Sequence, residues 1–167
     1  MTIEEAIQTA IELENEVRDV YRAAAAEAVD PMGKRVFTVL ADEEQGHVDY
    51  LESRLGDWRK TGKVNLVALD TVVPSAEAIA EAVDSLSEGM SDVDHGTEME
   101  MLGKALEAEC KTSGFYRQMV AELPTAGQEL FQRFMEIEEG HVAIVQAEMD
   151  SLTGNGVWFD MLEIRLE

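Results

Sequence analysis

The sequence predicts an all-α fold, an antiparallel four-helix bundle with a long crossover that contains a short helix between the second and third long helices. Four long stretches carry apolar residues at alternating spacings of three and four, which is the helical repeat. The chain has only three prolines, and none interrupts such a stretch. With 167 residues, 46% of them hydrophobic, it can form one domain with a sizeable core.

The first pair of long helices is expected at residues 2–29 and 30–55. Thr2 and Glu5 have the spacing of a capping box, which satisfies the first free amide groups of a helix. Asp30 is a good N-cap and is followed by proline at the first helical position. A short link therefore joins two antiparallel helices.

A long connection is expected from about residue 56 to residue 91, because helix-breaking residues interrupt the periodicity there. Residues 75–89 within it have the pattern of a short helix. A connection of this length can carry the chain from one end of a bundle to the other.

The second pair of long helices is expected at residues 91–124 and 125–154. Ser91 and Asp94 have the spacing of a capping box for the first of them, and Thr125 is expected to open the second. A short link again predicts an antiparallel hairpin.

Residues 153–167 are expected to form a C-terminal tail after a domain at 1–152. Trp158 and Phe159 would be unfavourable to leave in water. The tail is therefore expected to fold back on its own bundle or to pack on a partner subunit, and we expect a homo-oligomer such as a dimer.

Charge and cysteine content exclude several classes of function. The formal net charge is -22, from 35 acidic and 13 basic residues, which opposes binding to nucleic acid or to anionic membranes. Cys110 is the single cysteine, so the chain has no internal disulfide and no thiolate metal site. No apolar run reaches the ~18 residues of a membrane span, and no signal peptide is recognisable, so we expect a cytoplasmic protein.

Each long helix places one glutamate in the middle of its apolar seam, and two helices add a histidine three residues later on the same face. A buried carboxylate must be paired, protonated or bound to a metal, because burying it alone is unfavourable. The six residues are Glu14, Glu44, His47, Glu109, Glu138 and His141.

These positions belong to an internal repeat. Glu14 and Glu109 are 95 residues apart, and Glu44 and Glu138 are 94 apart. Two similar hairpins around a pseudo-twofold axis would bring all six polar groups to one level. The repeat also pairs, at separations of 94 or 95 residues, His47 with His141, Tyr21 with Tyr116, Phe37 with Phe131, and Gly46 with Gly140.

The six residues suit two divalent cations, since four carboxylates balance four positive charges and neutral imidazoles complete the coordination. One Glu on each of two helices and Glu-x-x-His on each of two others is typical of di-iron and di-manganese carboxylate proteins. We expect two iron ions, with zinc or manganese as alternatives. The competing interpretation, a hydrogen-bonded network without metal, leaves four core carboxylates against two histidines.

Other residues near the seams carry weaker expectations. Tyr21 and Tyr116 are candidates to hydrogen-bond to the ligand carboxylates or to relay electrons, and the alternative is that they only pack in the core. Gly46 and Gly140 suggest close approach of helices, and His95 is expected on the surface. Most of the glutamates that flank the seams are expected in solvent, with one a candidate partner for a histidine; they are Glu12, Glu16, Glu43, Glu107 and Glu139.

At these residues the chain resembles the rubrerythrin branch of the ferritin-like superfamily, over nearly its whole length to about Leu152. The resemblance implies a ferritin-like bundle in which Glu44 and Glu138 bridge the metals and Glu14 and Glu109 are terminal ligands. The matching stretches are ELENEVRDVY, LADEEQGHVDYL, LEAECKTSGFY and MEIEEGHVAIV.

Two features depart from rubrerythrins. The chain lacks the cysteines of a rubredoxin domain, so electrons are expected from a separate donor such as a rubredoxin-like protein. Thr112 stands where rubrerythrins have an additional glutamate that takes part in a redox-linked ligand exchange.

The resemblance implies an oxidoreductase that reduces hydrogen peroxide or dioxygen. A second interpretation keeps the same site but makes the protein a ferroxidase or an iron-handling protein without peroxidase turnover. A third is a structural bundle in which zinc fills the site.

Overall fold

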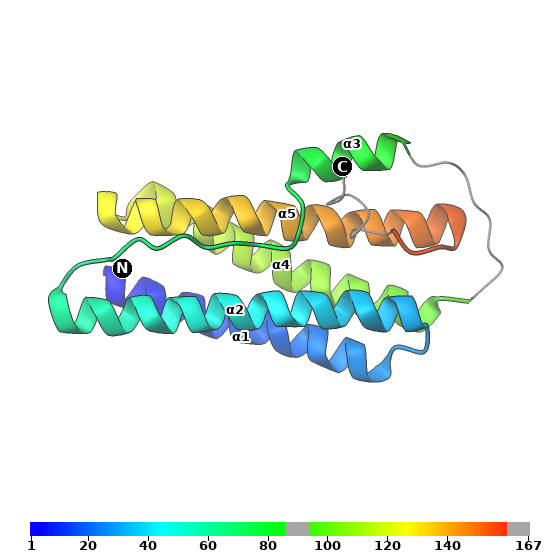
Figure 1. Ribbon diagram of the computed structural model, residues 1–167, viewed down its shortest axis with the longest axis horizontal. Helices are drawn as coiled ribbons and strands as arrows, with labels where there is room; N and C mark the ends of the chain where they lie inside the picture. Colours follow the sequence, from blue (N-terminus) through cyan, green and yellow to red (C-terminus); the bar gives the residue numbers. More distant parts are fainter. Residues whose placement is uncertain (86–93, 160–167) are drawn as a thin grey trace.

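The computed structural model describes residues 1–85 and 94–159, and these residues contain helices and no strand, which confirms an all-α fold. Figure 1 shows the long helices lying lengthwise, with the short helix alongside the last of them. Within the same residues, none of the helices combines the length and the apolarity that a bilayer span requires. The elements are α1 (Ile3–Glu27), α2 (Pro31–Thr61), α3 (Ala76–Ser85), α4 (Gly96–Glu122) and α5 (Thr125–Asn155).

The interior consists of two apolar clusters with a polar layer between them. On α1, residues 3–10 belong to one cluster and residues 17–24 to the other, and Glu14 lies between them. The other three long helices repeat this arrangement, each with its seam glutamate between the two clusters. The close helix pairs are α1 with α2, α4 with α5, α1 with α4, and α3 with α5.

The predicted starts of α1 and α2 are confirmed. The Thr2 hydroxyl accepts from the Glu5 amide at 3.2 Å, and the Glu5 carboxylate accepts from the Thr2 amide at 2.7 Å. The Asp30 carboxylate accepts from the amides of Met32 and Gly33 at 2.8 and 3.2 Å. These contacts satisfy amide groups that have no partner within the helix.

The predicted end of α2 at residue 55 is wrong, because the helix continues to Thr61. Leu55 is buried and Trp58 packs against the same apolar cluster, so tertiary contacts carry the helix through Gly56. Gly62 then ends it in the left-handed conformation, with φ of 67°.

The predicted capping box at the start of α4 is wrong. The N-cap of α4 is His95, without a side-chain cap, while Asp94 accepts from the amide of Gly96 at 2.9 Å. Ser91 lies outside the described residues. The predicted opening of α5 at Thr125 is confirmed, and its N-cap is Pro124, which makes no side-chain cap.

The described part of the connection between α2 and α4 runs along the long helices. Figure 1 shows residues 62–75 running along α2 and α5 before α3 begins. The Tyr50 hydroxyl of α2 donates to the carbonyl of Val67 at 2.8 Å, and the Arg133 guanidinium of α5 donates to that of Leu69 at 3.1 Å. The connection therefore contacts both helices. The expected continuation of the short helix over 86–89 falls on residues that the structure does not describe.

Glu98 of α4 is a buried carboxylate that ties the two hairpins together. It accepts from the amides of Val29 at 2.9 Å and Asp30 at 3.1 Å, in the link between α1 and α2. Burial would raise the pKa of Glu98, but these amide donors outweigh it and lower the pKa. The ionised carboxylate thus holds the link against α4.

The start of the tail folds back on its own chain. Phe159 is 2% exposed, and its amide donates to the buried carboxylate of Glu148 at 2.7 Å. The Trp158 ring lies edge-on to Phe37, with centroids 5.7 Å apart. A Cβ on Gly33 would lie 2.4 Å from that indole, so any larger residue at this position would displace the ring. Residues 158–159 therefore fold back on their own chain, which is one of the two expected arrangements of the tail. The homo-oligomer stays a prediction.

The expectation that His95 lies on the surface is wrong. The ring is 7% exposed, and its Nε2 lies 2.9 Å from the carbonyl of Gly156. Trp158 covers it edge-on, with centroids 6.2 Å apart. Packing of the tail therefore buries this histidine.

The buried position of Phe159 leads to a stability prediction. Phe159→Ala should lower the free energy of unfolding by about 3 kcal/mol, because it removes a buried aromatic side chain and leaves a cavity. Val157→Ala is the matched control, since Val157 is 39% exposed and its truncation should change stability by less than about 0.5 kcal/mol. Urea unfolding of both variants measures the difference, and equal effects would contradict the docking of the tail.

Candidate metal centre

The six seam residues predicted from the sequence meet in the polar layer. They come from all four long helices, and each side chain is at most 1% exposed. The structure therefore brings the whole set together, while their binding of metal stays a prediction. The residues are Glu14 on α1, Glu44 and His47 on α2, Glu109 on α4, and Glu138 and His141 on α5.

The set divides into two groups of four, and in each group the potential ligand atoms lie within 4.8 Å of one another. The His47 subsite contains Glu14, Glu44, His47 and Glu138. The His141 subsite contains Glu44, Glu109, Glu138 and His141. Both subsites share two glutamates, one from each hairpin, as bridging carboxylates would.

Both histidines direct Nδ1 toward carboxylates. His47 Nδ1 lies 3.2 Å from Glu14 Oε2 and 3.1 Å from Glu44 Oε2. His141 Nδ1 lies 2.7 Å from Glu44 Oε1 and 3.5 Å from Glu109 Oε1. The two rings are nearly parallel, with centroids 5.2 Å apart. Nδ1 is therefore the nitrogen that each histidine presents to the centre.

The two seam tyrosines hold the two outer carboxylates. The Tyr116 hydroxyl of α4 donates to Glu14 of α1, and the Tyr21 hydroxyl of α1 donates to Glu109 of α4. Burial, and then the charge of a neighbouring glutamate, raise the pKa of each tyrosine well above its usual value, so both remain donors. The expected hydrogen bonds from the tyrosines to the seam glutamates are therefore present, while the electron relay stays a prediction.

Several buried polar atoms of the cluster lack a hydrogen bond, and this is the observation that tests the fit of a cation. Within residues 1–85 and 94–159, both oxygens of Glu138, one of Glu44 and one of Glu109 have no hydrogen-bond donor. Glu44 Oε1 approaches His141 Nδ1 at 2.7 Å without hydrogen-bond alignment. Buried acceptors without donors are unfavourable, and divalent cations would satisfy them. The donor set therefore fits hard or borderline metal ions.

Without metal, the cluster holds additional protons. Burial, reinforced by the charge of Glu44, raises the pKa of Glu14 to about 8. Burial and then Glu14 raise the pKa of Glu138 well above its usual value. Burial would lower the pKa of His47, but Glu44 and Glu14 outweigh it and raise that pKa to about 10. In the metal-free protein, bound protons thus neutralise part of the negative charge that cations would otherwise neutralise.

Glu43 is the flanking glutamate that lies beside a histidine, at ion-pair distance but without a hydrogen bond among the described residues. Its Oε2 lies 3.8 Å from His141 Nε2. The Thr71 hydroxyl donates to Oε2 at 2.6 Å, and the Val72 amide donates to Oε1 at 2.8 Å. Burial would raise the pKa of Glu43, but these partners lower it. The other flanking glutamates are exposed as expected: Glu12, Glu16, Glu107 and Glu139.

The expected close approach of helices at Gly46 and Gly140, the glycines before the two histidines, is wrong. A Cβ on Gly46 would have no neighbour within 4 Å. A Cβ on Gly140 would lie 2.8 Å from the carbonyl oxygen of Pro74, so the crossover occupies that space. The crossover therefore covers the α5 half of the site and makes the two halves of the repeat different.

Thr112 is buried one turn after Glu109, and its hydroxyl donates to the Ala108 carbonyl of its own helix at 3.1 Å. It therefore presents no carboxylate at that position. Cys110 is exposed and lies off the seam, as expected.

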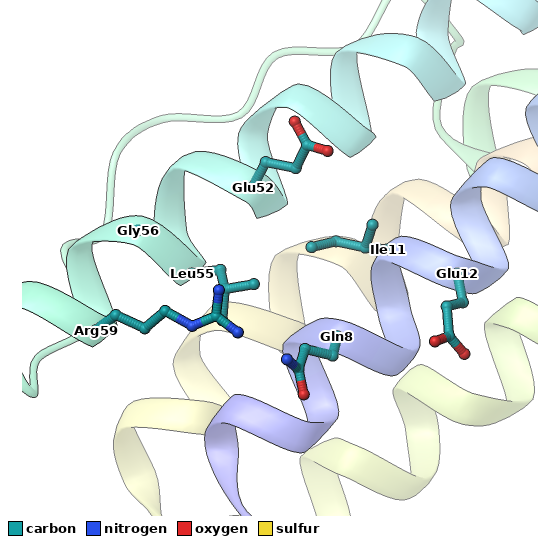
Figure 2. A pocket seen from close by; sticks show the side chains of 7 residues that line it. All are labelled: Gln8, Ile11, Glu12, Glu52, Leu55, Gly56 and Arg59. Carbon is teal, nitrogen blue, oxygen red and sulfur yellow. The ribbon is translucent and has the colours of Figure 1, made fainter.

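An open surface hollow of about 590 Å³ between α1 and α2 is separate from this cluster. Figure 2 shows Arg59, Glu52 and Gln8 at its wall, and no candidate ligand lines it. The candidate centre is a buried layer instead of an open cleft.

Comparison of the chain with family models, curated proteins and solved structures finds no match. The assignment of chemistry therefore depends on the geometry of the cluster itself.

The raised pKa values predict how pH affects the metal-free protein. Folding raises the pKa of Glu14 from 4.5 to about 8 and the pKa of His47 from 6.5 to about 10. At a pH between the unfolded and the folded pKa of a group, the folded chain binds more protons than the unfolded chain. The stability of the folded chain therefore falls as pH rises through that interval. Thermal unfolding of chelator-treated protein should show a melting temperature that decreases from about pH 6.5 to about pH 8.

Glu14→Gln removes one of the retained protons and should flatten this slope, whereas exposed Glu12→Gln should leave it unchanged. A melting temperature that rises over the same interval would contradict the assigned protonation.

Proposed function

We propose that this chain is a ferritin-like four-helix bundle of the rubrerythrin type, holding two iron ions and reducing hydrogen peroxide or dioxygen with electrons from a separate donor. The observation that carries the proposal is the pair of four-residue subsites that share Glu44 and Glu138. Paired inward-facing Glu-x-x-His motifs with one additional glutamate from each remaining helix characterise di-iron carboxylate bundles.

Charge balance supports two ions over one. The four glutamates carry four negative charges when ionised, which two divalent cations neutralise with imidazoles as neutral ligands. In such an arrangement Glu14 and His47 would hold one ion, Glu109 and His141 would hold the other, and Glu44 and Glu138 would be available to both.

Two ferrous ions bound there would supply the two electrons that, with two protons, convert hydrogen peroxide into two waters. The chain's own groups fix the geometry for that chemistry. Tyr21 and Tyr116 hold the outer carboxylates by hydrogen bonds from the opposite hairpin. The apolar clusters on both sides exclude water from the layer.

The donor types favour iron or manganese over structural zinc. The cluster offers four carboxylates and two imidazoles, and no thiolate lies among them. Structural zinc sites are usually four-coordinate and rich in cysteine or histidine. Carboxylate ligands suit manganese as well, so metal analysis decides between the two.

A second candidate function is iron handling with ferroxidase activity. Thr112 favours it, because that residue supplies no additional carboxylate for a ligand exchange. The two functions differ after oxidation. A peroxidase keeps a stable pair of ions and returns to the ferrous state with a donor, whereas a handling protein releases its iron.

Anaerobic iron titration tests the proposal. Ferrous iron should bind at two equivalents per chain, and added peroxide should oxidise the bound iron within seconds, followed by absorbance. Glu138→Gln should abolish the second equivalent, because an amide cannot bridge two cations. Glu139→Gln is the matched control, since that neighbouring side chain is exposed and should leave the stoichiometry unchanged.

If protein from cells grown with iron contains only zinc, and peroxide does not oxidise it, the redox proposal is wrong. Release of iron after the first oxidation would move the assignment to iron handling.

A further inference from the structure

The two halves of the repeat differ beside the histidines. Glu43 precedes the seam glutamate of α2, and the residue 94 positions later, which precedes the seam glutamate of α5, is Ile137. Glu43 reaches across to the histidine of the opposite hairpin, at 3.8 Å from His141 Nε2. By the same symmetry, the residue that would face the outer nitrogen of His47 is an isoleucine.

The position of Glu43 is fixed by the crossover. Its two oxygens accept from Thr71 at 2.6 Å and from Val72 at 2.8 Å, and its side chain is 10% exposed. Residues 71–72 thus hold a carboxylate against one half of the centre. Ile137 is 3% exposed and offers no polar atom.

The difference between Glu43 and Ile137 affects metal binding through the outer nitrogen of each histidine. Both histidines present Nδ1 to the carboxylates, so a neutral ring that binds through Nδ1 carries its hydrogen on Nε2. For His141 the resulting donor faces Glu43. Among residues 1–85 and 94–159 neither Nε2 makes a hydrogen bond, but that of His141 lies 3.8 Å from a Glu43 oxygen. The Glu43 carboxylate is therefore nearer to His141 than to His47, although a ligand atom of His47 also lies within 4.8 Å of it.

The other supports of the centre are shared or symmetric. Glu44 and Glu138 belong to both subsites. The outer carboxylates each accept one tyrosine hydroxyl, from Tyr116 and from Tyr21. The orientation of the histidine is thus the difference that distinguishes the two subsites.

We propose that Glu43, anchored by residues 71–72, is a positioning residue that makes the His141 subsite the tighter one, so that metal fills it first and fills the His47 subsite second. This inference rests on the proposed two-metal function. Outer carboxylate partners of metal-binding histidines typically contribute 10- to 100-fold in affinity, which is enough to set the order of filling.

Repulsion between two neighbouring cations would make stepwise affinities unequal even for identical subsites, so the order must be read at each histidine. The probe is zinc, which is diamagnetic, added to full-length protein labelled with nitrogen-15 in its histidines. The chain has three histidines, and spectra of His47→Gln and His95→Gln assign them. At one equivalent, the Nδ1 signal of His141 should shift fully, while that of His47 should shift only between one and two equivalents.

Glu43→Ile places on α2 the residue found in the other half. It should weaken the His141 subsite by about 10- to 100-fold, so that both histidines respond together at one equivalent. The exchange variant Glu43→Ile/Ile137→Glu should reverse the order. Glu43→Gln keeps the size of the side chain and should reduce the preference, which keeps the test open if the isoleucine variant misfolds.

Simultaneous shifts of both histidines in the unaltered protein would overturn the inference, as would an order that Glu43→Ile and Glu43→Gln both leave unchanged. Shifts at Nε2 instead of Nδ1 would also overturn it, because they would place the ion beside Glu43, His47 and His141, a third group whose ligand atoms lie within 4.8 Å. Two zinc ions bound without order would leave the two-metal centre standing, whereas no uptake would refute both proposals.

Discussion

The burial of four carboxylates at one level of an apolar interior is the constraint on which the rest of this structure depends. Glu14, Glu44, Glu109 and Glu138 are each 0% exposed and lie between two apolar clusters. Helices cannot bring such groups together unless positive charge or protons neutralise them. The histidines and tyrosines contact these carboxylates, and the raised pKa values keep protons on some of them.

The hydrogen bonds of the layer join the two hairpins to each other. Tyr116 reaches Glu14, Tyr21 reaches Glu109, and His141 contacts Glu44, and every one of these contacts connects one half of the repeat with the other. The crossover adds a contact that has no counterpart, since Thr71 and Val72 fix Glu43. The duplicated sequence therefore encloses a centre whose two halves are not equivalent.

The helical seams and the repeat were sufficient to predict the all-α fold and the convergence of the six polar residues, because both depend on local periodicity. The same rule, extended one step along each seam, would have indicated Glu98 and Glu148, which are also buried. Helix caps and ends were harder to predict. Gly56 is held in α2 by the packing of Leu55, and His95 is buried by a tail distant in sequence. Such tertiary contacts leave no local pattern.

Anomalous diffraction from crystals of the iron- or manganese-loaded protein tests the central claim most directly. If the buried carboxylates hold two cations, the anomalous map will show two peaks in the polar layer, with Glu44 and Glu138 contacting both and one histidine Nδ1 contacting each. Peaks confined to exposed carboxylates, with a polar layer that holds only protons, would contradict the account.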